Sequence, residues 1–229
     1  MNAQETLAVA PRFSPLQDEL EPLRPTWGQL NGMAVPLDFG DRAGEAAAAG
    51  VLGLADSSAL GKLVLKGPGA EGLLQRQQIP IPGEIFQVAN LAGGGLVART
   101  GGAEFFLEDG CRGTLVSRLD SMLDSGGSGA FRVVRQDASI LLSGSRANEV
   151  FLQTCGHDFR NPGDSMVMTR VAGVSCSILH RAIGGVGTFQ LWMDGSFGGY
   201  LWETLLEIAS ELGGRPAGLV CFYPELVAV

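Results

Sequence analysis

The chain has 229 residues, of which 45% are hydrophobic and 17% charged, and its formal net charge at pH 7 is −8. This length allows one large or two small globular domains with a proper core. The acidic balance argues against nucleic acid and against an anionic membrane as the main partner, because both select for basic patches.

The N-terminus and the cysteines indicate the compartment. Residues 1–13 lack a basic region followed by an apolar run, so no secretory signal is visible. No stretch reaches the roughly 18 to 20 apolar residues that a membrane span needs. Cys111, Cys155, Cys176 and Cys221 are scattered and form no CxxC pair. We therefore expect a cytoplasmic protein with reduced thiols and no membrane partner.

Residues 1–57 precede the more regular part of the chain. We expect residues 1–13 to form a flexible tail and residues 14–57 to form a leader that packs onto the first half of the protein. The alanine-rich stretch Gly44–Gly50 predicts a short helix within this leader.

An internal repeat organises the remainder of the chain. Residues 63–74 read LVLKGPGAEGLL and residues 140–151 read ILLSGSRANEVF, so that Gly67 and Ala70 match Gly144 and Ala147 at an offset of 77. Each copy has an apolar run, a glycine turn and a short helical pattern. A Pro-Gly pair follows in both copies.

The similarity resumes further along each half. Residues 104–107 and 188–191 are strand-like, and residues 115–123 and 201–212 have the apolar spacing of helices. The second helix should end at Gly213-Gly214, because glycine favours a helix C-terminus. Each half therefore reads strand, helix, two or three strands, helix.

This order predicts an α+β fold made of two pseudo-repeated, ferredoxin-like β-α-β-β-α halves. We expect the domains to be residues 14–124, the leader plus the first half, and residues 125–229, the second half. The glycine- and serine-rich stretch of residues 124–129 would link them.

One glycine motif resembles a nucleotide site. Residues 67–72 match G-x-G-x-x-G between a strand pattern and a helix pattern. The helix is only about two turns long, and no acidic strand end follows at the expected distance. A structural turn is the better interpretation.

Metal and nucleophile motifs are weak as well. Cys155, His157, Cys176 and His180 lack the short paired spacing of a zinc site, and buried cysteines with hydrogen-bonded histidines explain them better. The serines of residues 142–145 lack a G-x-S-x-G elbow. We predict no catalytic, cofactor-binding or metal-binding residue on this chain.

Other polar and aromatic residues have two interpretations. The carboxylate pairs Glu19/Glu21 and Glu203/Glu207 lie on patterns typical of a solvated surface. Trp192, Tyr200 and Trp202 flank the last helix, where they could anchor a partner or pack in the core. The sequence leaves both possibilities open.

Several motifs in shared order carry a family resemblance. Ser14–Leu16, Met33–Gly40, Gly53–Leu63 and the later stretch Phe189–Gly218 resemble the T-protein family, which includes the aminomethyltransferase of glycine cleavage. The shorter spacing between them is similar to that of the gamma subunit of heterotetrameric sarcosine oxidase. Residues 138–147 and 155–159 resemble that subunit too, and N-methylglutamate dehydrogenases have a similar one.

Two departures from the family concern its acidic residues. The resemblance implies an acid after a Gly-Gly pair, which acts near the folate amine, but Leu91–Arg99 reads LAGGGLVAR. It implies a second acid before the late phenylalanine, where Ile183–Phe189 reads IGGVGTF. Without a carboxylate, the paired N–H donors of a pterin would be buried without an acceptor.

The resemblance therefore implies a non-catalytic assembly subunit of a sarcosine oxidase-type complex, which demethylates sarcosine or a similar N-methyl amino acid. FAD, FMN, NAD and tetrahydrofolate would sit on sibling subunits of that flavoprotein oxidase or dehydrogenase. The alternatives are a free-standing folate-binding protein of the T-protein superfamily and, ranked lower, an aminomethyltransferase with rearranged residues.

Overall fold

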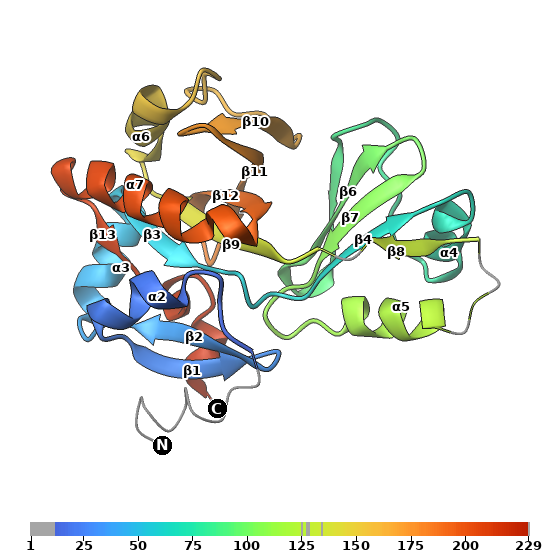
Figure 1. Cartoon of the computed structure of the whole chain (residues 1–229), viewed down its shortest axis with the longest axis horizontal. Helices are drawn as coiled ribbons and strands as arrows, with labels where there is room; N and C mark the ends of the chain where they lie inside the picture. Colours follow the sequence, from blue (N-terminus) through green and yellow to red (C-terminus); the bar gives the residue numbers. More distant parts are fainter. Residues whose placement is uncertain (1–11, 125, 127–128, 134, 229) are drawn as a thin grey trace. The chain divides into compact units, whose positions relative to one another are not determined.

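The computed structural model describes residues 12–124, 126, 129–133 and 135–228, and it divides into two compact units (Figure 1). Unit 1 is drawn from Met1–Ala59, Gln136–Gly163 and Val167–Val229. Unit 2 is drawn from Leu60–Arg135 and Asp164–Met166. Each unit contains both helices and a sheet, so the predicted α+β class is confirmed.

Unit 1 is built on a six-stranded sheet with the spatial order β10-β11-β12-β9-β3-β13. All neighbouring pairs are antiparallel except β13 with β3. The strands are β3 (Gly53–Asp56), β9 (Asp137–Ser143), β10 (Val167–Val171), β11 (Val174–Ile183), β12 (Val186–Asp194) and β13 (Arg215–Pro216).

Helices α6 (Ala147–Thr154) and α7 (Gly198–Glu211) supply one side of the unit 1 core. Alternate residues of β9 point into this core, among them Ala138, Ile140 and Leu142. Because side chains alternate along a strand, Ser139 and Ser143 lie on the opposite face of the sheet. That face carries the polar residues described below.

The leader also belongs to unit 1. It contains α2 (Gln17–Leu20), the hairpin of β1 (Thr26–Leu30) and β2 (Met33–Asp38), and the predicted short helix, α3 (Arg42–Val51). Asn31 and Gly32, with φ of 50° and 75°, make the two-residue hairpin turn that an Asn-Gly pair favours.

The expectation that the leader packs onto the first half was wrong. Strand β3 pairs with β9 of the second half, where Gly53 lies opposite Ser143. Leu16 and Leu20 are fully buried in the same core as Leu205 of α7. A strand's own pattern reports which face is apolar but does not identify its hydrogen-bonding partner, so sequence proximity was a poor guide.

Unit 2 contains a five-stranded antiparallel sheet with the order β5-β6-β7-β4-β8. Apolar side chains from its strands, such as Leu65 and Phe105, form a core with Leu74 of α4 and Leu119 of α5. The elements are β4 (Lys62–Lys66), α4 (Ala70–Arg76), β5 (Val88–Asn90), β6 (Leu96–Gly101), β7 (Glu104–Glu108), α5 (Leu115–Asp124) and β8 (Phe131–Val133).

The elements follow the predicted order in both halves. The series β4, α4, β5, β6, β7, α5 and the series β9, α6, β10, β11, β12, α7 each read strand, helix, three strands, helix. That the halves are copies of one ferredoxin-like unit stays a prediction. The compact units differ from the predicted division at residue 124, because residues 12–59 join the second half and residues 129–133 and 135 join the first.

Some predictions fall outside the described residues. These include most of the predicted tail, residues 1–11, and residues 125, 127 and 128 of the predicted linker. Short 3-10 helices complete the described chain, namely η1 (Glu21–Leu23), η2 (Ala92–Gly94), η3 (Gly195–Phe197), η4 (Leu219–Cys221) and η5 (Pro224–Ala228). No helix in the described ranges has the length and apolar character to cross a membrane.

Candidate functional site

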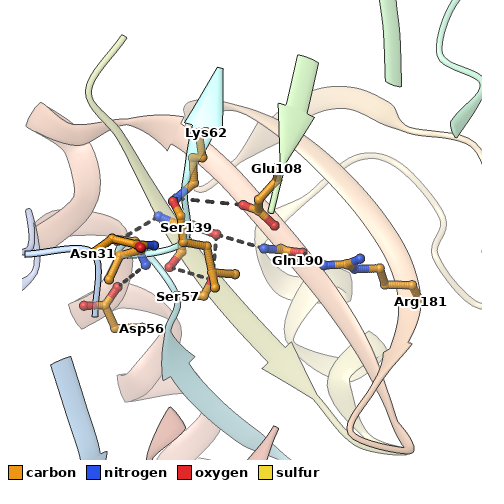
Figure 2. A network of polar contacts seen from close by, with 11 residues as sticks. Asn31, Asp56, Ser57, Lys62, Glu108, Ser139, Arg181 and Gln190 are labelled. Carbon is orange, nitrogen blue, oxygen red and sulfur yellow. Dashed lines mark hydrogen bonds and ion pairs between the residues drawn. The ribbon is translucent and has the colours of Figure 1, made fainter. Parts of the chain in front are cut away.

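Unit 1 carries a row of buried polar side chains on the sheet face opposite α6 and α7 (Figure 2). Ser57 Oγ lies 2.7 Å from Ser139 Oγ, and Gln190 Nε2 donates to Ser139 Oγ at 3.3 Å. Arg181 Nη2 donates to Gln190 Oε1 at 2.9 Å. Ser57, Ser139 and Gln190 are fully buried.

This row has a defined hydrogen-bond direction. Because Arg181 donates to the amide oxygen of Gln190, the amide nitrogen faces Ser139. These bonds engage the Ser57 and Ser139 hydroxyls and both ends of the Gln190 amide, which the sheet buries.

Asp56 lies at the end of β3 and is engaged in positioning the chain. Its Oδ2 accepts from Ser14 Oγ at 2.5 Å, and its Oδ1 accepts from the Ser58 N–H at 2.8 Å. Ser14 Oγ in turn accepts from the Leu16 N–H at 3.1 Å. These contacts fix the start of the leader, so the role we assign to Asp56 is structural.

Unit 2 contains a buried ion pair between two neighbouring strands. Lys62 of β4 lies opposite Glu108 of β7, and Lys62 Nζ is 3.8 Å from Glu108 Oε2 (Figure 2). Lys62 Nζ also donates to the Leu60 carbonyl at 3.0 Å. Glu108 is fully buried, and an enclosed carboxylate of this kind needs a cation or hydrogen-bond donors.

The first glycine-rich loop, Leu91–Arg99, lies beside Glu108. Strand β6 begins in this loop, and Leu96 pairs directly with Glu108 across the sheet. The loop itself has no carboxylate, but the neighbouring strand brings one to the same place. The sequence of the loop alone could not reveal Glu108, because a residue on the neighbouring strand is distant in sequence.

Backbone conformation accounts for Gly93 and Gly94 of this loop, and close packing accounts for Gly95, whose Cβ would lie 2.7 Å from the Glu108 carbonyl oxygen. Gly93 and Gly94 have φ of 74° and 84°. A Cβ on Gly110 would lie 1.8 Å from the Gly93 carbonyl oxygen. Only glycine permits this approach of two chain segments.

Next along the chain, Asp109 binds the N-terminal end of α5. Its Oδ2 accepts from the Val116 N–H at 3.0 Å. Burial raises the pKa of Asp109, although the N–H groups of Val116 and Leu115 oppose this shift. Asp109 therefore caps the N-terminal end of this helix.

The second glycine-rich loop is a tight hairpin turn between β11 and β12. Gly184 and Gly185 have φ of 59° and 81°, as a two-residue turn of this kind requires. A Cβ on Gly184 would also lie 2.5 Å from the Phe222 carbonyl oxygen. The turn carries no acid, and its geometry explains the glycines without a ligand.

The G-x-G-x-x-G motif is a structural turn as well. Gly67 has φ of 118°, and a Cβ there would lie 2.6 Å from the Gly129 carbonyl oxygen. The Gly69 N–H donates to the same Gly129 carbonyl. The helix that follows, α4, has only seven residues.

The two histidines among the candidate zinc ligands pack against neighbouring aromatic rings, since the centroids of Phe159 and Phe189 are 5.4 Å apart. His157 lies against Phe159 and His180 against Phe189, both at 4.6 Å between ring centroids. Burial lowers the pKa of His180. In the ranges that the structure describes, no three His, Cys, Asp or Glu side chains gather as a metal site.

The structure also shows the surroundings of the cysteines and of the large aromatic residues. Cys111, Cys155, Cys176 and Cys221 form no disulfide with one another. Trp192 and Trp202 are buried in unit 1, whereas Tyr200 is 53% exposed. Of the two interpretations, core packing holds for the two tryptophans and an exposed position holds for Tyr200.

Two solved structures have a similar fold. Glycine cleavage system aminomethyltransferase T from Bartonella henselae matches with a TM-score of 0.71 and 17% identity over 92% of this chain and 60% of that chain. Heterotetrameric sarcosine oxidase from Corynebacterium sp. U-96, in complex with pyrrole 2-carboxylate, matches with a TM-score of 0.59 and 18% identity over 76% of this chain and 93% of that chain.

The sequence comparisons are more limited. An aminomethyltransferase from Thermoanaerobacter pseudethanolicus is 32% identical over 50 residues, which are 22% of this chain and 14% of that protein. No protein-family model matches the chain. The chain spans 60% of the Bartonella aminomethyltransferase, so the activity of that whole protein does not transfer by likeness. The predicted fold relation is nevertheless confirmed: the chain has a T-protein-like fold, shared with glycine-cleavage aminomethyltransferase and with a chain of heterotetrameric sarcosine oxidase.

Proposed function

We propose that this chain is a non-catalytic assembly subunit of a sarcosine oxidase-type complex, which oxidises sarcosine or a similar N-methyl amino acid. The observation that carries the proposal is the match to 93% of a sarcosine oxidase chain. Because that match uses only 76% of the present chain, the sarcosine oxidase chain is the shorter of the two.

The described side chains support an assembly role. The polar row of unit 1 is held by bonds within the protein, and the second glycine loop has no acid. FAD, FMN, NAD and tetrahydrofolate would then be bound by sibling subunits. A cytoplasmic location is part of this proposal.

The test is purification of the tagged chain from its native source. We expect a flavoprotein to co-purify in constant proportion, and the eluate to oxidise sarcosine or a related N-methyl amino acid. A variant with a disrupted unit 1 core, Leu205→Asp, is the control for specific capture. Recovery of the intact tagged chain without any flavoprotein would contradict the proposal.

A second candidate function, free-standing folate binding, is favoured by Glu108. Its buried carboxylate lies across the sheet from the first glycine loop, where the resemblance implies an acid. A carboxylate is the acceptor that the paired N–H donors of a pterin need. Lys62, however, already lies 3.8 Å from it.

Thermal unfolding with tetrahydrofolate separates the two candidates. Ligand present at 100 times its Kd would stabilise the folded chain by about 2.7 kcal/mol, which is a clear rise in Tm. Under the subunit proposal we expect no rise for the isolated chain. A rise in the wild type that is lost in Glu108→Gln would instead establish the folate-binding function.

A further inference from the structure

The outer face of α7 combines exposed aromatic side chains with unbalanced negative charge. Phe197 immediately precedes this helix and is 52% exposed, and Tyr200 in its first turn is 53% exposed. The three-residue spacing places both on one side of the chain. We call this surface, with Glu203, Glu207 and Glu211, the α7 face.

Tyr200 is fixed in place although its ring is exposed. Its hydroxyl donates to the Ala172 carbonyl at 3.1 Å, in the turn that joins β10 to β11. The ring is thereby oriented before any partner arrives. Exposed aromatic residues that lose little freedom on binding are typical of the centres of protein interfaces.

The glutamates of this face repel one another along the helix. Glu203, Glu207 and Glu211 are exposed and follow at intervals of four residues, which brings like charges together. The last turn of α7 contains no basic residue of its own, and the cation at this end of the helix is Arg146, whose Nη1 donates to the Leu212 carbonyl at 2.5 Å. No ion pair within the described part of the chain involves these three residues.

Helix α2 adds to the negative charge. Glu19 lies against the first turn of α7, since a Cβ on Gly199 would meet Glu19 Oε1 at 2.2 Å. Burial, followed by the neighbouring carboxylates of Glu203 and Asp18, raises the pKa of Glu19. The repulsion therefore extends across two helices of unit 1.

We infer that the α7 face is a docking surface for a basic surface of a sibling subunit, with Phe197 and Tyr200 at its centre. Positive side chains on that subunit would neutralise the glutamates, and its apolar groups would cover the two rings. This inference rests on the proposed function, because it takes the partner to be a subunit of the same flavoprotein complex.

The test is co-purification of the flavoprotein with charge variants of the tagged chain. Glu203→Lys combined with Glu207→Lys should lower the recovered flavoprotein at least tenfold. The matched control, Glu84→Lys with Asp164→Lys, reverses two exposed acids of unit 2 and should leave recovery within twofold of wild type.

Neutral variants distinguish a loss of binding from a loss of folding. Glu203→Gln with Glu207→Gln removes the repulsion, so the isolated chain should melt at a higher temperature while it captures less flavoprotein. Capture that stays within twofold of wild type in both α7 variants would overturn the inference while leaving the proposed function intact. Wild-type chain that captures no flavoprotein would contradict both.

Discussion

The carboxylate of Glu45 is fully buried in unit 1 and joins three backbone segments. Its Oε1 accepts from the N–H groups of Phe39 at 2.8 Å and Asp41 at 3.1 Å, and its Oε2 accepts from the Gly218 N–H at 2.8 Å. The residue therefore ties the end of β2 and the start of α3 to the segment after β13. The sequence shows only a glutamate within an alanine-rich helix, so this role could not be predicted.

Replacement of Glu45 by glutamine should destabilise the protein by about 2–3 kcal/mol, because one amide oxygen can replace only one of the two acceptors. The amide nitrogen would then face a backbone N–H, donor against donor. Urea unfolding measures the loss, with exposed Glu207→Gln as a control expected to stay within about 0.5 kcal/mol of wild type. Equal stability of the two variants would contradict this role of Glu45.

The thiol of Cys176 should be chemically inert in the folded protein. Burial raises its pKa to about 12, so its thiolate is scarce at any pH at which the protein is handled. At pH 8 iodoacetamide should label Cys155, which is partly exposed, at least about tenfold faster than Cys176. Mass spectrometry of the native protein measures both rates, and rapid labelling of Cys176 before unfolding would show that it is not enclosed.

Residue patterns predict part of the polar sites. Gln190 interrupts the apolar stretch of β12, so the sequence indicates that this polar side chain has polar partners. Its connection to Ser139 and Arg181 depends on the register of three strands, which no local pattern encodes. Lys62 and Glu108 likewise look like ordinary strand ends until β4 and β7 are paired.

At the scale of elements, the turn between β11 and β12 offers a matched test. Gly184 and Gly185 both have positive φ, but only Gly184 lies against another chain segment, at Phe222. Alanine at Gly185 should cost about 1–2 kcal/mol for the left-handed backbone alone. Alanine at Gly184 should cost about 1–3 kcal/mol more, because its Cβ meets backbone that must shift.

Thermal or urea unfolding of the two alanine variants checks this difference. Gly185→Ala serves as the internal control, since a Cβ there has open space within 4 Å. Equal losses of stability would mean that Phe222 moves away at little cost, contrary to the packing described.

The elements themselves were largely predictable. Helix α3 covers the predicted Gly44–Gly50 stretch, α5 covers residues 115–123, and α7 ends just before Gly213-Gly214 as expected. The apolar spacing of a helix and the glycines that end it are local patterns, so helices can be predicted well from the sequence. The placement of β3 failed because its partner, β9, lies more than 80 residues further along the chain.

At the scale of the whole molecule, the fold is shared with aminomethyltransferase T, whereas two loops lack the acids that the family resemblance implies. The fold relation rests on a TM-score of 0.71 over 92% of the chain. The two glycine-rich loops carry no acid, but Glu108 on a neighbouring strand brings a carboxylate beside the first of them. The central claim at this scale is assembly with flavoprotein subunits.

Native mass spectrometry of the untagged complex from its source tests that claim most directly. The chain has a mass of 23.9 kDa, and we predict that it occurs in a larger assembly with flavin-containing subunits in fixed stoichiometry. Mild dissociation should release it without bound flavin. Recovery of the chain only at its own monomer mass, in an extract where sarcosine oxidation is intact, would contradict the account.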